Sequence, residues 1–128
     1  MKKIYIFLMI ILSIFLTTAC AQQNPEYVMT VDELKKEMEE NPNLVILDVR
    51  TEAELVGPLG KIDGVINIPI QLLANRLNEL EPYKDKDIAV ICRTGNRSTT
   101  GTEILVENGY KARNVLGGMV AYNKVKLP

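Results

Sequence analysis

The sequence of 128 residues contains no histidine and has only two cysteines, Cys20 and Cys92. Without histidine, a Cys–His catalytic relay is impossible and the common zinc-ligand sets cannot be assembled. A reactive thiol in this chain must therefore be activated by backbone dipoles and by basic side chains. An excess of basic charge is also lacking, because 15 basic residues face 16 acidic ones. We therefore expect no nucleic-acid partner, and we expect neither a metal nor another cofactor.

The N-terminus carries the three parts of a secretory signal peptide. Lys2 and Lys3 precede an apolar run over residues 4–16, and the small residues 17–19 follow it. The run is shorter than the roughly 20 residues that a membrane-spanning helix needs. We therefore interpret residues 1–21 as a targeting segment, removed from a bacterial protein that is exported to the cell envelope.

Two processing outcomes fit this segment. The run Thr17-Thr18-Ala19-Cys20 resembles a bacterial lipobox, although Thr17 stands where leucine is commonest. Cleavage there would remove residues 1–19 and leave Cys20 lipidated. Alternatively, Ala19-Cys20-Ala21 is a small-x-small cleavage site that would release a soluble periplasmic protein beginning at Gln22. We favour the lipoprotein, in which a lipid on Cys20 is the sole attachment to the membrane.

Residues 22–128 are the expected folded domain, which is large enough for one hydrophobic core. Either processing route leaves Cys92 without a disulfide partner, because Cys20 is lipidated or removed. Small exported domains usually use cysteines in pairs. The single remaining thiol is therefore interpreted as reactive rather than structural, and we expect the domain to be a monomer.

Apolar runs alternate with helical patterns along this domain. Capping-box pairs, Thr30 with Glu33 and Thr51 with Glu54, open two helices, and Asn108-Gly109 ends a later one. The alternation predicts an α/β fold built on a largely parallel sheet. The strand candidates are 27–29, 44–47, 65–68, 88–91 and 114–116, and the helix candidates are 30–40, 51–56, 73–80, 103–108 and 118–124.

The reactive chemistry is concentrated where the apolar run Ile88–Ile91 ends at Cys92. Ligands of open α/β sheets bind at the carboxyl ends of strands. Loop N–H groups and the positive end of a following helix stabilise an anion at such a position. We therefore predict that Cys92 has a lowered pKa and is nucleophilic at neutral pH, with Arg93 and Arg97 adding positive charge.

Three segments, in this order, resemble the single-domain rhodanese family of thiosulfate sulfurtransferases. They are Leu47–Thr51 followed by Gly64–Pro69, then Cys92–Ser98, then Leu116–Met119 followed by Tyr122. The resemblance covers nearly all of residues 22–128. It implies a doubly wound, mainly parallel sheet flanked by helices, and catalysis through a persulfide on Cys92.

The resemblance also implies the reaction and the residues that bind its substrates. The Cys92 thiolate would take the outer sulfur of a small anionic donor such as thiosulfate and pass it to a thiol or to cyanide. Arg97 would contact the sulfonate of the donor. Ser98 would either hydrogen-bond the bound sulfur or cap the next helix, which is the commoner use of serine there. The substrate-binding residues implied are Arg93, Thr94, Gly95, Asn96, Arg97 and Ser98.

Two positions depart from the family pattern. Lys61 stands where histidine is frequent, and Tyr122 stands where tryptophan is frequent, but neither change removes the nucleophile. Asp48 and Arg50 also invite a catalytic interpretation. For this pair we expect instead a buried salt bridge or a turn that shapes the edge of the sheet.

Other functions stay open beside sulfur transfer with turnover. A phosphatase of the same fold places five residues between its cysteine and arginine, whereas four residues separate Cys92 from Arg97. A persulfide carrier would hold the same sulfur without efficient turnover and hand it to a partner. A redox role is the least favoured, because no resolving cysteine remains for Cys92.

Overall fold

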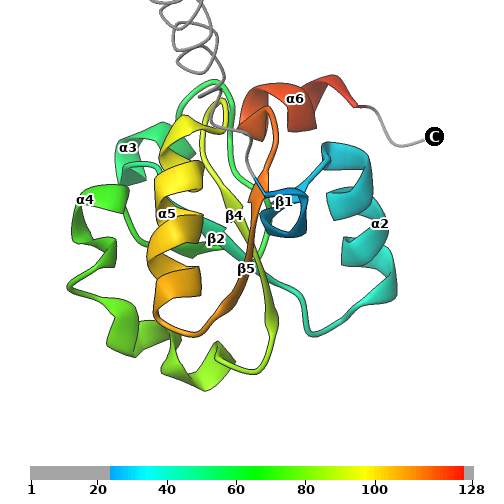
Figure 1. Ribbon diagram of the computed structural model, residues 1–128. Coiled ribbons are helices and arrows are strands. Elements are labelled where there is room, and N and C mark those ends of the chain that lie inside the picture. The colour runs from blue at the N-terminus through cyan, green and yellow to red at the C-terminus, as the bar shows by residue number, and fades with distance from the viewer. Residues whose placement is uncertain (1–23, 126–128) are drawn as a thin grey trace, which may run out of the picture.

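The computed structural model describes residues 24–125, so the predicted targeting segment 1–21 and the predicted lipidation site Cys20 lie outside the described residues. Five strands form one entirely parallel sheet with the order β1-β5-β4-β2-β3 (Figure 1). The strands are β1 (Val28–Met29), β2 (Val45–Asp48), β3 (Ile66–Asn67), β4 (Asp87–Ile91) and β5 (Lys111–Val115).

Helices cover both faces of this sheet, with α4 and α5 on one face and α2 and α6 on the other (Figure 1). None of the helices within residues 24–125 has the length and apolar character to cross a membrane. The α-helices are α2 (Val31–Glu40), α3 (Glu52–Leu55), α4 (Ile70–Leu73), α5 (Asn96–Glu107) and α6 (Gly118–Lys124), and the 3₁₀ helices are η1 (Pro25–Tyr27) and η2 (Leu77–Tyr83).

Each central strand contributes side chains to two separate cores. In β4, Ile88 and Val90 pack under α4 and α5, whereas Ala89 and Ile91 pack under α2 and α6. Strands buried on both faces require continuous apolar runs rather than alternating ones, which is the pattern in this sequence. The predicted doubly wound, mainly parallel α/β fold is therefore confirmed.

The predicted helix over residues 73–80 is replaced by two shorter elements. The α-helix α4 ends at Leu73, and the 3₁₀ helix η2 begins at Leu77 and passes through Pro82. A 3₁₀ helix has three residues per turn, so it aligns Leu77 and Leu80 on one side. Both leucines, with Leu73, still pack into the core as the sequence indicated. The spacing was therefore correct about burial and wrong about the kind of helix.

Helix α5 begins seven positions earlier than the apolar spacing from Glu103 indicated. Its first residue is Asn96, and Gly95 precedes it in the left-handed conformation with a φ of 106°. The residues at its start are short and polar, so they carry no helical periodicity that a sequence pattern could reveal. As a result, Arg97 and Ser98 lie on the first turn of a helix rather than in an open loop.

Candidate active site

Cys92 lies directly after β4, at the carboxyl edge of the sheet where α5 begins. Its side chain is 1% exposed, and it is the free cysteine within residues 24–125. The Gly95 N–H donates a hydrogen bond to Cys92 Sγ at 3.1 Å, and Ser98 Oγ lies 3.2 Å from the same sulfur. The strand end, the loop and the helix start therefore converge on one sulfur atom, as the sequence predicted.

Hydrogen bonds lower the pKa of the Cys92 thiol. Burial of the thiol acts in the opposite direction and raises the pKa. The Ser98 side chain and the N–H groups of Ser98, Gly95 and Thr94 outweigh it, so the pKa lies below its ordinary value. The lowered pKa agrees with the prediction, and hydrogen bonds to the sulfur cause it.

Helix α6 donates hydrogen bonds to the backbone of the loop that follows Cys92. The Met119 N–H donates to the Cys92 carbonyl at 2.9 Å, and the Val120 N–H donates to the Arg93 carbonyl at 3.1 Å. In a trans peptide the C=O and the next N–H point in opposite directions. Because the Arg93 carbonyl is directed to α6, the Thr94 N–H is directed away from that helix, on the side of the sulfur. The first turn of α6 therefore orients the amides that surround Cys92.

Gly118 is required for this close approach. A Cβ at this position would lie 2.5 Å from the Cys92 carbonyl oxygen and 2.6 Å from the backbone of Arg93. Its φ of 55° also lies in the left-handed region. In the sequence, Gly117-Gly118 belongs to the last segment of the resemblance, Leu116–Met119, and the composition of this segment gave no sign of its contact with the sulfur-bearing loop.

Arg97 is paired with Glu54 of α3 rather than directed at the sulfur. Its two terminal nitrogens lie 2.8 and 2.7 Å from the Glu54 carboxylate oxygens. The Arg97 hydrogen bond is the main cause that lowers the pKa of Glu54 to about 2. Thr51, through its N–H and its hydroxyl, holds the same carboxylate. Sequence reasoning had assigned Glu54 only to a capping box.

The other loop residues divide between the surface and the interior. Arg93, Thr94 and Asn96 are exposed, whereas Gly95 and Ser98 are buried. Arg93 lines a surface hollow of about 460 Å³ together with Glu54 and Leu59. Of the two arginines of this loop and helix start, Arg93 is an exposed cation and Arg97 is paired with a carboxylate.

Ser98 does not cap α5, because the helix begins two residues earlier with Gly95 as its N-cap. Its hydroxyl instead lies between Cys92 Sγ and the amide of Asn114, whose Oδ1 is 2.6 Å from Ser98 Oγ. Asn114 is a buried residue of β5 that sequence reasoning placed in a strand without a role at the site. The strand also contains Lys111 and Arg113, so the polar character of Asn114 did not mark it out.

Asp48 and Arg50 form a buried structural pair, as expected. Arg50 Nη2 lies 2.7 Å from Asp48 Oδ2, and the two side chains are 1% and 0% exposed. The same nitrogen donates to the Gly60 carbonyl at 2.8 Å, which fixes the segment preceding Lys61 against the end of β2. No cluster of three or more potential metal ligands occurs in the described part of the chain, residues 24–125.

The domain has a parallel α/β fold, and Cys92 lies at the carboxyl end of its central strand β4. Backbone amides surround the sulfur of this cysteine. These features define the class of protein. The rhodanese-like domain family matches residues 30–125, and the chain belongs to this family.

Individual relatives are consistent with this assignment. A sulfurtransferase of Allochromatium vinosum is 30% identical over 98 residues, which are 76% of this chain and 88% of that protein. The thiosulfate sulfurtransferase PspE of Escherichia coli is 36% identical over 67 residues, covering 51% of this chain and 64% of that protein. The crystal structure of a rhodanese-like domain protein from Staphylococcus aureus superposes with a TM-score of 0.68 at 35% identity, covering 75% of this chain and 90% of that one. These relatives support sulfur transfer in general.

Proposed function

We propose that this protein moves a sulfane sulfur from thiosulfate, or a similar small anion, through a Cys92 persulfide to a thiol acceptor. The observation that carries the proposal is the surroundings of Cys92 Sγ. A buried sulfur accepts a hydrogen bond from the Gly95 N–H at 3.1 Å, and its pKa is lowered by neighbouring N–H groups. Such a site holds a sulfur anion and keeps it nucleophilic.

The reaction consists of two displacements at sulfur. The Cys92 thiolate attacks the outer sulfur of thiosulfate, a new S–S bond forms, and sulfite leaves with the electron pair of the bond that breaks. An acceptor thiolate then attacks the outer sulfur of the persulfide. The acceptor becomes a persulfide and the Cys92 thiolate is regenerated. No net oxidation occurs, so no redox partner is required.

The dimensions of the loop favour sulfur over phosphate. Four residues separate Cys92 from Arg97, which is one fewer than in the phosphatase pattern. Arg97 is also engaged by Glu54 through two short contacts, so its guanidinium is not free to clamp three phosphate oxygens. A phosphatase function would require both the wider loop and the free guanidinium.

Intact-mass analysis before and after incubation with thiosulfate tests the proposal. We expect the wild type to gain the mass of one sulfur atom, and a subsequent thiol to remove it. Cys92→Ser should load no sulfur, because a hydroxyl at this position is not ionised at neutral pH, while its thermal unfolding midpoint should stay close to that of the wild type.

The mass analysis, together with an aryl phosphate assay, separates the proposal from its alternatives. Loading that no small thiol or cyanide reverses would identify a persulfide carrier rather than an enzyme with turnover. Rapid Cys92-dependent release from an aryl phosphate, without loading by thiosulfate, would contradict sulfur transfer and identify a phosphatase.

A further inference from the structure

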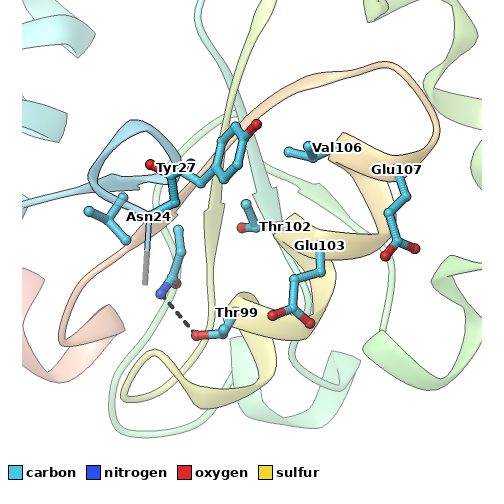
Figure 2. Close-up of a pocket in the computed structure, with 9 residues that line it drawn as sticks. Asn24, Tyr27, Thr99, Thr102, Glu103, Val106 and Glu107 are labelled. Atoms are coloured by element: carbon cyan, nitrogen blue, oxygen red, sulfur yellow. Dashed lines mark hydrogen bonds between the residues drawn. The ribbon is translucent and has the colours of Figure 1, made fainter. Parts of the chain in front are cut away.

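A buried chain of polar groups leads from the candidate nucleophile into β5. Ser98 Oγ lies 3.2 Å from Cys92 Sγ and 2.6 Å from Asn114 Oδ1. On the other side of the amide, Asn114 Nδ2 donates to Thr99 Oγ1 at 3.1 Å (Figure 2). The Thr99 hydroxyl in turn donates to the Gly95 carbonyl at 2.7 Å. The contacts of Ser98 with Cys92 and Asn114 are buried, so water competes little for them, whereas the contacts of Thr99 are partly buried.

The orientation of the Asn114 amide follows from these partners. A backbone carbonyl can only accept, so Thr99 gives its single hydroxyl proton to Gly95. The Thr99 oxygen must then accept from its other neighbour, which requires the NH₂ group of Asn114 to face it. The amide oxygen is thereby turned toward Ser98, where it can only accept.

Ser98 consequently stands between two acceptors with one proton to give. Asn114 Oδ1 is the closer at 2.6 Å, and an ionised Cys92 Sγ is the other at 3.2 Å. We propose that Asn114 is a positioning residue that competes with Cys92 for the Ser98 hydroxyl proton, and so limits the hydrogen bonding that the thiolate receives. This inference rests on the proposed function in taking Cys92 as the nucleophile.

The charged groups around the network are few. On the Cys92 side, α5 contributes Arg97, which is paired with Glu54, and the loop contributes the exposed Arg93. Asp48, the last residue of β2, is buried and paired with Arg50. On the Asn114 side, Glu103 and Glu107 line the same surface pocket as Asn114 and Thr99 (Figure 2). All of these groups are retained in the substitutions described below.

The test is the pH dependence of Cys92 alkylation in the full chain, followed by the mass of the Cys92 peptide. Asn114→Leu removes the competing acceptor and releases the Ser98 proton to the thiolate. We expect the pKa of Cys92 in this profile to fall by about one unit, a tenfold gain in thiolate below the pKa. Asn114→Asp supplies only acceptors and a negative charge, so the pKa should rise by a similar amount.

Two controls separate positioning from support of the fold. Thr102→Val removes a buried hydroxyl that donates to the Ser98 carbonyl at 2.8 Å, so it disturbs the same turn without altering the Ser98 hydroxyl. It should lower the unfolding temperature and leave the alkylation profile unchanged. In a Ser98→Ala background, Asn114→Leu should no longer shift the profile, because no proton remains to be released. Asn114→Val replaces the leucine variant if that variant does not fold.

The outcomes are distinct. An unchanged profile in Asn114→Leu, or the same shift with and without Ser98, would overturn the positioning role. Alkylation does not require a sulfur donor, so a failure of thiosulfate to load Cys92 would refute the proposed function while leaving this result intact.

Discussion

Glu54 and Arg97 come from distant parts of the sequence, yet they form an ion pair close to the candidate site. The Arg97 guanidinium carries the charge that an anionic donor would seek, and the Glu54 carboxylate neutralises it at 2.7 Å. Both side chains are about one-third exposed, at 32% and 31%. On the proposed function, the affinity for the donor would depend on how readily Arg97 exchanges Glu54 for the donor.

Substitutions of this pair should move thiosulfate affinity in opposite directions. Glu54→Gln leaves Arg97 free to bind the sulfonate, so the KM for thiosulfate should fall, by up to about tenfold for roughly 1.4 kcal/mol of added attraction. Arg97→Ala leaves an unpaired carboxylate at the mouth, so the KM should rise. Steady-state cyanide assays measure both, and equal KM values in the two variants would show that Arg97 does not meet the donor.

The same pair makes a contribution to stability that depends on pH. The pKa of Glu54 is about 2 in the folded protein, well below the value of about 4.3 expected in the unfolded chain. A lowered folded pKa stabilises the protein above the unfolded pKa, and this stabilisation is lost as the pH falls toward the folded value. The difference in urea midpoint between wild type and Glu54→Gln should therefore be constant above about pH 5 and shrink between about pH 4.5 and 2. A difference that does not change over this range would contradict the assigned ion pair.

At the scale of elements, the site is a junction of β4, the loop that follows it, and the first turn of α6. Met119 and Val120 direct two carbonyls of the loop away from the sulfur, and Gly118 permits the approach. The amides that stabilise the thiolate thus depend on a helix that itself holds no reacting group.

Gly118→Ala should abolish the reactivity of Cys92 although the cysteine itself is still present. The added methyl group would meet backbone atoms at 2.5 to 2.6 Å, and the backbone conformation is unfavourable to alanine. We expect a loss of at least about 2 kcal/mol in the free energy of unfolding, together with loss of sulfur loading at temperatures where the variant is folded.

Gly109→Ala is the matched control for that substitution. Gly109 also has a positive φ, of 84°, but the atom nearest to an added Cβ is the flexible end of Lys84 at 3.5 Å. This variant should lose about 1 kcal/mol and should load sulfur normally. Equal effects of the two substitutions would mean that backbone strain, rather than contact with the loop, explains Gly118.

The sequence predicted the strands and helices that depend on local patterns of residues. It missed the contacts between residues that are far apart in the chain. Continuous apolar runs revealed β2 and β4, and the Thr30–Glu33 capping box of α2 is present in the structure. The pairing of Arg97 with Glu54 joins residues 43 positions apart, and no local pattern indicates it. The same holds for Asn114, whose amide meets Ser98 only after β5 has paired with β4. The position of Cys92 at the end of β4 was therefore predictable from the sequence, and the side-chain contacts around it were not.

At the scale of the whole molecule, the lipid anchor proposed at Cys20 would attach the domain to the membrane. Cys20→Ala should convert a membrane-associated protein into a soluble exported one, because alanine cannot carry the lipid. Fractionation of cells with antibody detection measures the change, and Cys92→Ala serves as the control that should not alter the distribution. An unchanged membrane fraction in Cys20→Ala would refute the lipobox.

The contact between α6 and the loop also has a consequence for biosynthesis. A ribosome adds residues 118–120 after all five strands, and these residues supply the donors that orient the Cys92 and Arg93 carbonyls. The growing polypeptide therefore carries the Cys92 thiol through the synthesis of residues 93–117 without the donors that orient the loop around it. On the proposed function, a product terminated before residue 118 would contain Cys92 and β1 to β5 and would still load no sulfur, because it lacks the donors that orient the loop.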